Sequence, residues 1–175
     1  MVDASVPTQG VLIDLDFAVR VAQHGNPIDG ETFPRAGTLI FRAFDLLTPD
    51  NPLKAYYRHD LESFFYTLLW IQMHYVDGKK HVHPDANSFD FNFDVTWGST
   101  RGQKVGFLLG SCHMDGYQLP LTSLRDEWLT PMHRMFGEAL RARRNFTREG
   151  KGAALDQETF GGRITYEAFE NVIRR

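Results

Sequence analysis

The sequence predicts a mainly α-helical domain with a short β-hairpin near its N-terminus, a central buried helix and long loops. Three stretches carry apolar residues at helical spacing, whereas only two short apolar runs have the character of strands. The predicted helices cover 60–73, 131–144 and 165–173, and the predicted strands cover 10–13 and 17–21. With 175 residues, 42% of them hydrophobic and 13% aromatic, the chain is long enough for one domain with a ring-rich core, and we expect a single domain over 1–175.

Composition narrows the classes of partner and compartment. The formal net charge of −3 gives no basic excess for nucleic acid or for an anionic membrane. The single cysteine, Cys112, excludes an internal disulfide and a multi-cysteine metal site. The most apolar window, 64–73, is half the length of about 20 residues that a membrane span requires, and the N-terminus is polar. We therefore expect a cytoplasmic or nuclear protein that binds neither nucleic acid nor membrane.

The N-terminal third alternates short strands with a long loop. Gly10-Val11-Leu12-Ile13 is flanked by Gly and Asp and predicts a buried strand, and a second extended piece follows Asp14-Leu15-Asp16. Residues 22–52 carry four prolines and several turn pairs. A loop of this length within a compact domain usually carries function or moves.

The clearest helix is expected to begin at Asp60. An aspartate there can cap the free amides of the first turn. One face is predicted to be core, with Leu61, Phe64, Phe65, Leu68 and Leu69 at helical spacing, and the other side carries Tyr66, Trp70 and Ile71. A helix that is apolar nearly all round is expected at the centre of the domain.

The C-terminal half predicts further helices separated by polar, glycine-rich stretches. A short helix is expected over 100–109, ending at Gly110, after a turn-rich stretch over 77–94. Ser123 begins another candidate, and Thr130-Pro131 gives a cap and first-turn proline for a helix to about Arg144. Its buried face is predicted to comprise Met132, Met135, Phe136 and Leu140. We expect 146–162 to be exposed, and a last helix from Thr165 to turn inward Tyr166, Phe169, Val172 and Ile173.

Three segments, in this order, resemble the C-terminal lobe of a eukaryotic-type protein kinase. Residues 10–18 are similar to the strand and Asp-Phe-Gly turn, 37–45 to the end of the activation segment, and 58–66 to the start of the central F helix. The Asp-Leu-Asp variant and the run Arg-His-Asp-Leu-Glu-Ser-Phe-Phe-Tyr look most like fungal-type protein kinases. The resemblance covers about Gly10 to Trp70. It implies a partial kinase-like C-lobe, with an activation-segment-like part over 10–52, an F-like helix over 60–73 and C-terminal helices over 123–175.

The resemblance implies roles for two parts of the activation-segment-like stretch. Asp14 would hold Mg²⁺ on the phosphates of ATP, because phosphoryl transfer needs a metal carboxylate and phosphate clamps. The alternative is an aspartate that ends a strand and makes a turn. Gly37 and Thr38 match the loop that receives the substrate, and the alternative there is an ordinary Gly-Thr turn.

Two further acidic residues match structural positions of the kinase lobe. Asp45 stands where a kinase has a glutamate that pairs with an arginine near the end of the lobe. Arg141, Arg143 and Arg144 are candidate partners, and the sequence does not choose among them. Asp60 matches a residue that accepts backbone amides from the catalytic loop, and its alternative is a plain helix cap.

The parts of a kinase that would precede Asp14 are missing from these residues. A kinase needs a glycine-rich phosphate loop, a strand lysine paired with a helix glutamate, and a His-Arg-Asp loop with a downstream asparagine. The 13 residues before Asp14 contain none of these. We therefore expect no catalytic residue and no cofactor for the chain in isolation, with ATP and Mg²⁺ binding only where an N-lobe completes it.

Three functional interpretations follow. The first is an inactive C-lobe that acts by binding a protein partner or a second copy of itself. The second is the downstream part of an active Ser/Thr protein kinase whose N-lobe and catalytic loop lie outside these residues. The third is a small helical binding domain whose resemblance to kinases is misleading.

Three other groups of residues are weaker candidates. His74, His81 and His83 could suggest a metal site, but the adjacent Lys79 and Lys80 favour an exposed loop. Cys112-His113 has the composition of a nucleophile pair, yet adjacent side chains rarely face one another, so an ordinary thiol is favoured. The basic run 141–148 suggests either an acidic-partner patch or, as we favour, a solvated helix end.

Overall fold

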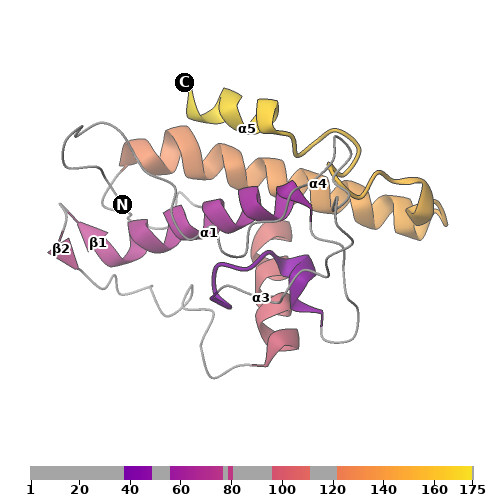
Figure 1. Cartoon of the computed structure of the whole chain (residues 1–175), viewed down its shortest axis with the longest axis horizontal. Helices are drawn as coiled ribbons and strands as arrows, with labels where there is room; N and C mark the ends of the chain where they lie inside the picture. The colour runs from indigo at the N-terminus through magenta and orange to yellow at the C-terminus, as the bar shows by residue number, and fades with distance from the viewer. Residues whose placement is uncertain (1–37, 49–55, 77–78, 81–95, 111–121, 175) are drawn as a thin grey trace, which may run out of the picture. The chain divides into compact units, whose positions relative to one another are not determined.

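A computed structural model of the chain describes residues 38–48, 56–76, 79–80, 96–110 and 122–174 (Figure 1). The chain divides into two compact units, 1–36 and 37–175, and the description below concerns the second. The predicted strands at 10–13 and 17–21 lie outside the described residues, and so does Asp14. The single-domain interpretation stays a prediction.

The described part is mainly helical, which confirms the predicted fold class. Helices α1 and α4 run side by side in opposite directions, α5 lies along α4, and α3 runs across them beside η2 (Figure 1). Strands β1 and β2 form an antiparallel pair in which Tyr75 faces Lys80. In chain order the elements are η2 (Phe44–Leu47), α1 (Tyr57–His74), β1 (Tyr75–Val76), β2 (Lys79–Lys80), α3 (Trp97–Leu109), η4 (Leu124–Leu129), α4 (Thr130–Arg148), η5 (Gly152–Ala154) and α5 (Tyr166–Ile173).

Helix α1 begins three residues earlier than predicted, so the expected cap at Asp60 is wrong. The N-cap is Tyr56, whose backbone N–H donates to Nδ1 of His59 at 3.1 Å. The imidazole thus supplies an acceptor for an amide that has no partner within the helix. Asp60 lies in the first turn, where its side chain is exposed.

The buried face of α1 is narrower than the sequence suggests. Phe65 and Leu69 are buried, whereas Phe64 is 42% exposed and Ile71 is 40% exposed. The prediction that Phe64 is a core residue is therefore wrong. At 100° per residue, Phe64 and Ile71 share the side of Asp60 and lie opposite Leu69.

The π-helical stretch η4 continues directly into α4, and α4 ends later than predicted. Thr130 is not a cap: its own backbone is helical, and its N–H donates to the carbonyl oxygen of Arg125, five residues earlier. The wider register suits the next residue, Pro131, which has no N–H and crowds the preceding turn. Of the predicted buried face, Met132, Phe136 and Leu140 are buried and Met135 is half-buried.

Helices α3 and α4 approach closely at a glycine. Helix α3 begins at Trp97, after Thr96, whose hydroxyl accepts from the N–H of Ser99 at 3.4 Å, and it ends at Gly110 as predicted. A Cβ atom placed on Gly137 of α4 would lie 2.5 Å from the carbonyl oxygen of Leu108. Only glycine permits this approach of the two backbones.

The loop between α4 and α5 is partly buried, contrary to the expectation of an exposed stretch. Leu155 and Phe160 are core residues. Phe160, Gly161 and Gly162 have φ values of 51°, 70° and 77°, so the chain reverses through three left-handed residues. Asp156 supports the turn by accepting from the N–H of Glu158 at 2.9 Å.

Helix α5 begins one residue after its predicted start, and Thr165 is its N-cap. The hydroxyl of Thr165 accepts from the N–H of Ala168 at 3.0 Å. Phe169 is buried as predicted, but Tyr166 is 57% exposed, so its inward assignment is wrong. Its ring instead stacks on that of Tyr57 at 4.7 Å between centroids. Among the described residues no helix has the length and apolarity needed to cross a bilayer.

Candidate functional site

Asp45 lies at the centre of a buried cluster of charged and aromatic side chains. Four separate elements contribute to it: η2, α1, α4 and the loop before α5. We call it the Asp45 cluster, and its members are Asp45, Arg58, His59, Arg143 and Phe160.

Two arginines pair with the two oxygens of the Asp45 carboxylate. Nη2 of Arg58 donates to Oδ2 at 2.7 Å, and Nη1 of Arg143 donates to Oδ1. Nε2 of His59 lies 3.9 Å from Oδ2. Of the three arginines that the sequence offered, the structure thus selects Arg143, while Arg141 donates to the carbonyl oxygen of Leu109.

Phe160 covers the arginines of the cluster. The guanidinium of Arg58 lies 3.8 Å from the centroid of its ring, and that of Arg143 lies 5.3 Å away. Such contacts stabilise a guanidinium that has lost water. Nε of Arg58 also donates to the carbonyl oxygen of Gln157 at 2.7 Å, which ties the same loop to α1.

The Asp45 carboxylate stays charged. Burial by itself raises the pKa of Asp45, but the contact with His59 and the charges of Arg58 and Arg143 outweigh it and bring the pKa well below its usual range. A carboxylate so paired accepts hydrogen bonds and does not exchange protons near neutral pH. Its chemistry is to hold elements together.

A second pair of buried ionisable groups holds η2 and the chain just before it. Oε1 of Glu62 accepts from the N–H of Phe44 at 2.9 Å, and Nζ of Lys104 donates to the carbonyl oxygens of Ile40 at 2.7 Å and Arg42 at 2.5 Å. Burial raises the pKa of Glu62 and lowers that of Lys104.

Sequence reasoning missed both Glu62 and Lys104. A glutamate near the N-terminus of a helix suits the helix dipole, so nothing in the sequence indicates that Glu62 is buried. Lys104 has a detectable signal, because Thr100, Lys104 and Leu108 recur every four residues and all three are buried. A lone lysine on such a face indicates a buried cation with carbonyl partners.

The structure brings only part of the predicted site together. Asp14 and Gly37 lie outside the described residues. Thr38 is exposed, and its carbonyl oxygen accepts from the N–H of Phe41 at 3.0 Å, which closes a turn. Asp60 is exposed and takes no part in the Asp45 cluster.

The weaker candidates gain no site. Nδ1 of His74 lies 2.8 Å from the carbonyl oxygen of Trp70, and the two rings stack at 4.4 Å. The pair Cys112-His113 and the histidines 81 and 83 lie outside the described residues. Where the structure describes side chains, no three His, Cys, Asp or Glu residues gather in a way that could hold a metal ion.

Comparison with known proteins covers the first part of the chain. Residues 2–72 match the family model described as fungal protein kinase. No curated protein and no solved structure matches the chain. The matched stretch includes Asp45, Arg58 and Glu62, which anchor η2 to α1. Over residues 2–72 the chain is therefore kinase-like, and the kinases that it is similar to are those of the fungal protein kinase family.

Proposed function

We propose that this 175-residue chain is a kinase-like helical module that binds another polypeptide and does not transfer phosphate on its own. The observation that carries the proposal is an exposed stripe on α1, formed by Asp60, Phe64 and Ile71. It lies within the stretch that matches fungal protein kinases.

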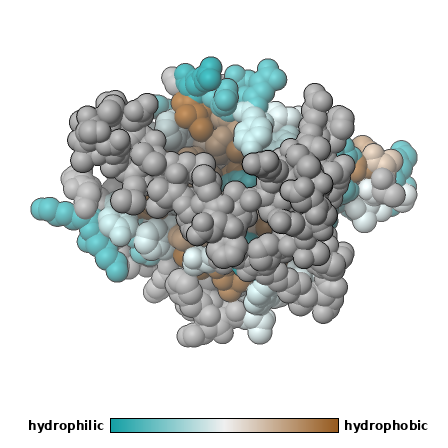
Figure 2. Space-filling view, viewed as in Figure 1, coloured by the Kyte–Doolittle hydropathy of each residue, from teal (hydrophilic) through white to brown (hydrophobic). Residues whose placement is uncertain are grey.

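The stripe lies on a helix that also supplies core residues. Phe64 is 42% exposed and Ile71 is 40% exposed, although the opposite face of α1 holds Phe65 and Leu69. Hydrophobic surface is visible among hydrophilic residues on the face drawn in Figure 2. Large apolar side chains that are partly exposed on a helix gain free energy when a partner covers them.

The proposed lack of phosphoryl transfer rests on chemistry that these residues do not supply. Transfer requires phosphate clamps, metal carboxylates and a base aligned on the nucleotide. The sequence has no Gly-x-Gly-x-x-Gly run and no His-Arg-Asp run. The Asp45 carboxylate, which two arginines engage, is an anchor rather than a base.

The match to fungal protein kinases also favours a second candidate function. In that interpretation the chain is part of an active Ser/Thr protein kinase completed by an N-lobe and a catalytic loop from elsewhere. Asp14 would then hold Mg²⁺ on ATP, and the α1 stripe would face the completing part.

One experiment tests the proposed inactivity. Thermal unfolding of the purified chain is followed with and without ATP and Mg²⁺, alongside Asp14→Ala. We expect no shift for either protein, because one carboxylate without phosphate clamps binds nucleotide poorly. A shift of several degrees that Asp14→Ala abolishes would overturn this half of the proposal.

A second experiment tests binding through the stripe. Sedimentation velocity is run on the chain alone and with a purified fungal-kinase segment that ends after its His-Arg-Asp loop. Phe64→Ser with Ile71→Ser is the test variant, and Glu167→Ser, which changes an exposed residue of α5, is the control. We expect a complex either of the chain with itself or of the chain with the kinase segment, and the test variant should weaken the affinity of that complex about tenfold or more.

The measurements on the chain alone and on its mixture with the kinase segment separate the binding module from the completed kinase. A chain that stays monomeric and binds no kinase segment at about 100 µM, the affinity of a weak contact, contradicts the binding proposal. Phosphorylation of casein by the mixed complex, lost with Asp14→Ala, replaces it with the kinase interpretation.

A further inference from the structure

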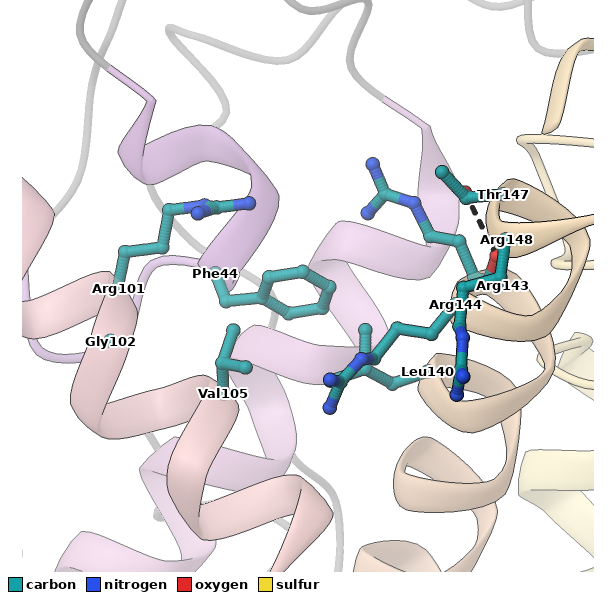
Figure 3. A pocket seen from close by; sticks show the side chains of 9 residues that line it. All are labelled: Phe44, Arg101, Gly102, Val105, Leu140, Arg143, Arg144, Thr147 and Arg148. Atoms are coloured by element: carbon teal, nitrogen blue, oxygen red, sulfur yellow. Dashed lines mark hydrogen bonds between the residues drawn. The ribbon is translucent and has the colours of Figure 1, made fainter. Parts of the chain in front are cut away.

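A pocket of about 420 Å³ lies beside the Asp45 cluster. Phe44 of η2 stands between α3, which carries Arg101 and Val105, and the C-terminal half of α4 (Figure 3). The volume of the pocket is that of a small-ligand site. The lining residues are Phe44, Arg101, Gly102, Val105, Leu140, Arg143, Arg144, Thr147 and Arg148.

The lining carries four arginines and no acidic residue. Arg143 is engaged by Asp45. For Arg101, Arg144 and Arg148, the part of the chain that the structure describes offers no acidic partner. Nε of Arg101 is buried and makes no hydrogen bond with any described residue. A buried donor without an acceptor costs free energy that a bound acceptor returns.

Helix electrostatics alone do not explain this arrangement. Arg144 and Arg148 lie near the C-terminal end of α4, where cations offset the negative end of the dipole. Arg101 has no such explanation, because it belongs to the first half of another helix, α3. Arg141, which the sequence grouped with Arg144 and Arg148, does not line the pocket.

The floor of the pocket selects the body of the ligand. Phe44, Val105 and Leu140 present apolar groups between the arginines (Figure 3). An inorganic ion would leave this surface in water, whereas an aromatic ring would cover it. A ligand that uses the whole pocket therefore combines an aromatic body with an anionic end.

The arginines select the anion. Guanidinium groups bind carboxylates and phosphates through paired N–H donors. A phosphomonoester carries a charge of about −1.5 to −2 at pH 7 and three acceptor oxygens, so it matches several arginines better than a carboxylate does.

We propose that this pocket binds an aryl phosphomonoester, namely the side chain of a phosphotyrosine in a partner protein. The ring packs on Phe44, and the phosphate takes hydrogen bonds from arginines of both α3 and α4. The proposal is independent of the α1 stripe, since Phe64 and Ile71 do not line the pocket.

The test is fluorescence anisotropy with the full chain at about 150 mM NaCl, where long-range charge attraction is screened. The probe is a fluorescein-labelled phosphotyrosine peptide with Gly and Ser flanks, compared with its unphosphorylated and phosphoserine forms. We expect the phosphotyrosine form to bind at least about tenfold more tightly than either. No anisotropy change up to about 1 mM chain, or equal binding of the three peptides at that level, overturns the proposal.

Competition separates the two sources of an aryl phosphate. Unlabelled phenyl phosphate should displace the peptide, and inorganic phosphate at the same concentration should not. The peptide should bind at least about tenfold more tightly than phenyl phosphate if the natural ligand is a protein side chain. Equal affinity of the two overturns the protein source and leaves a small aryl phosphate.

Arginine variants test the contacts. Arg101→Gln and Arg148→Gln should each weaken peptide binding about tenfold or more, the loss expected for a charge-assisted hydrogen bond. Arg134→Gln is the matched control, because Arg134 is exposed on α4 but does not line this pocket. An equal loss with Arg134→Gln would indicate general attraction by positive charge and would contradict a built site.

Two glycine variants, one that fills the pocket and one that does not, test the site without changing its charge. Gly102 lines the pocket, and Gly106 lies one helical turn further along α3 outside it; neither would give a Cβ any neighbour within 4 Å. Gly102→Leu should abolish peptide binding, and Gly106→Leu should leave it within about twofold. Equal binding by both variants, each shown by circular dichroism to be folded, would show that the peptide does not bind in this pocket.

Discussion

The guanidinium of Arg58 donates to the carboxylate of Asp45 at 2.7 Å, although the two residues belong to different elements. Both side chains are at most 4% exposed. The contact joins the first turn of α1 to η2, and Arg143 adds α4 to the same carboxylate. One aspartate thus connects η2 and α1, which belong to the kinase-like part, with α4, which lies beyond it.

Asp45→Asn should destabilise the chain by about 3–5 kcal/mol at pH 7, because it leaves Arg58 buried without a counter-charge. Urea unfolding measures this loss. Since the folded-state pKa of Asp45 is depressed, its contribution is complete above the ordinary value of 3.8 and declines as pH falls below it. The difference between wild type and variant should therefore narrow below that pH, and a constant difference down to about pH 3 would contradict the ion-pair account.

Phe65→Ala should cost about 3–5 kcal/mol in urea unfolding, the usual loss when a fully buried phenylalanine leaves a cavity. Phe65 is 0% exposed and packs against the ring of Phe136 at 5.5 Å between centroids. Leu68→Ala is a control on the same helix with a smaller expected loss, because Leu68 is half-buried. Equal losses for the two variants would mean that Phe65 is not at the centre of the core.

His59→Ala should destabilise the chain by about 1–2 kcal/mol, more than Asp60→Ala does. The His59 ring accepts the N–H of Tyr56 and lies near Asp45, so its loss removes a cap and a buried contact. We expect Asp60 to contribute at most through the helix dipole, worth about 0.3–1 kcal/mol and opposed by the burial that raises its pKa, and Asp60→Asn should cost the same as Asp60→Ala. Urea titrations of the three variants decide the order, and a larger loss at Asp60 would reinstate it as the cap.

The pH dependence of the His59 cap has a definite sign. Burial lowers the pKa of His59 below its ordinary value of 6.5, so the unfolded ring binds a proton before the folded ring does. Stability from this residue is therefore complete above pH 6.5 and lost as pH falls through the lowered folded value. The difference in unfolding free energy between wild type and His59→Asn should shrink below pH 6.5, and a difference that grows there would show the sign to be wrong.

Local signals in the sequence located several elements but not the contacts among them. Gly110 ends α3 as predicted, and α5 begins one residue after its predicted start at Thr165, because both signals act within one helical turn. The partner of Asp45 was left open, since Arg143 lies 98 residues away and its direction depends on the register of α4. Adjacent arginines on a helix point about 100° apart, and no local pattern says which one faces η2.

The errors have the same origin. Phe160 lies in a glycine-rich stretch that suggests exposure, yet it is buried because its ring covers the guanidinium of Arg58. Phe64 belongs to an apolar helix, yet it stays 42% exposed even though its ring meets that of Phe169 of α5 at 5.8 Å between centroids. In both cases burial is decided by tertiary neighbours that hydrophobicity along the chain does not specify.

Gly137→Ala and Gly106→Ala should change stability in opposite directions, although each adds one methyl group to a helix. The methyl group that replaces a hydrogen of Gly137 cannot fit 2.5 Å from the carbonyl oxygen of Leu108, so α3 and α4 must separate at a cost of about 1–3 kcal/mol or more. At Gly106 nothing lies within 4 Å, and the better helix propensity of alanine should stabilise the chain by about 0.5–1 kcal/mol. Urea midpoints of the two variants against wild type measure both effects. A Gly137→Ala chain as stable as Gly106→Ala would show that the two helices do not meet at this glycine.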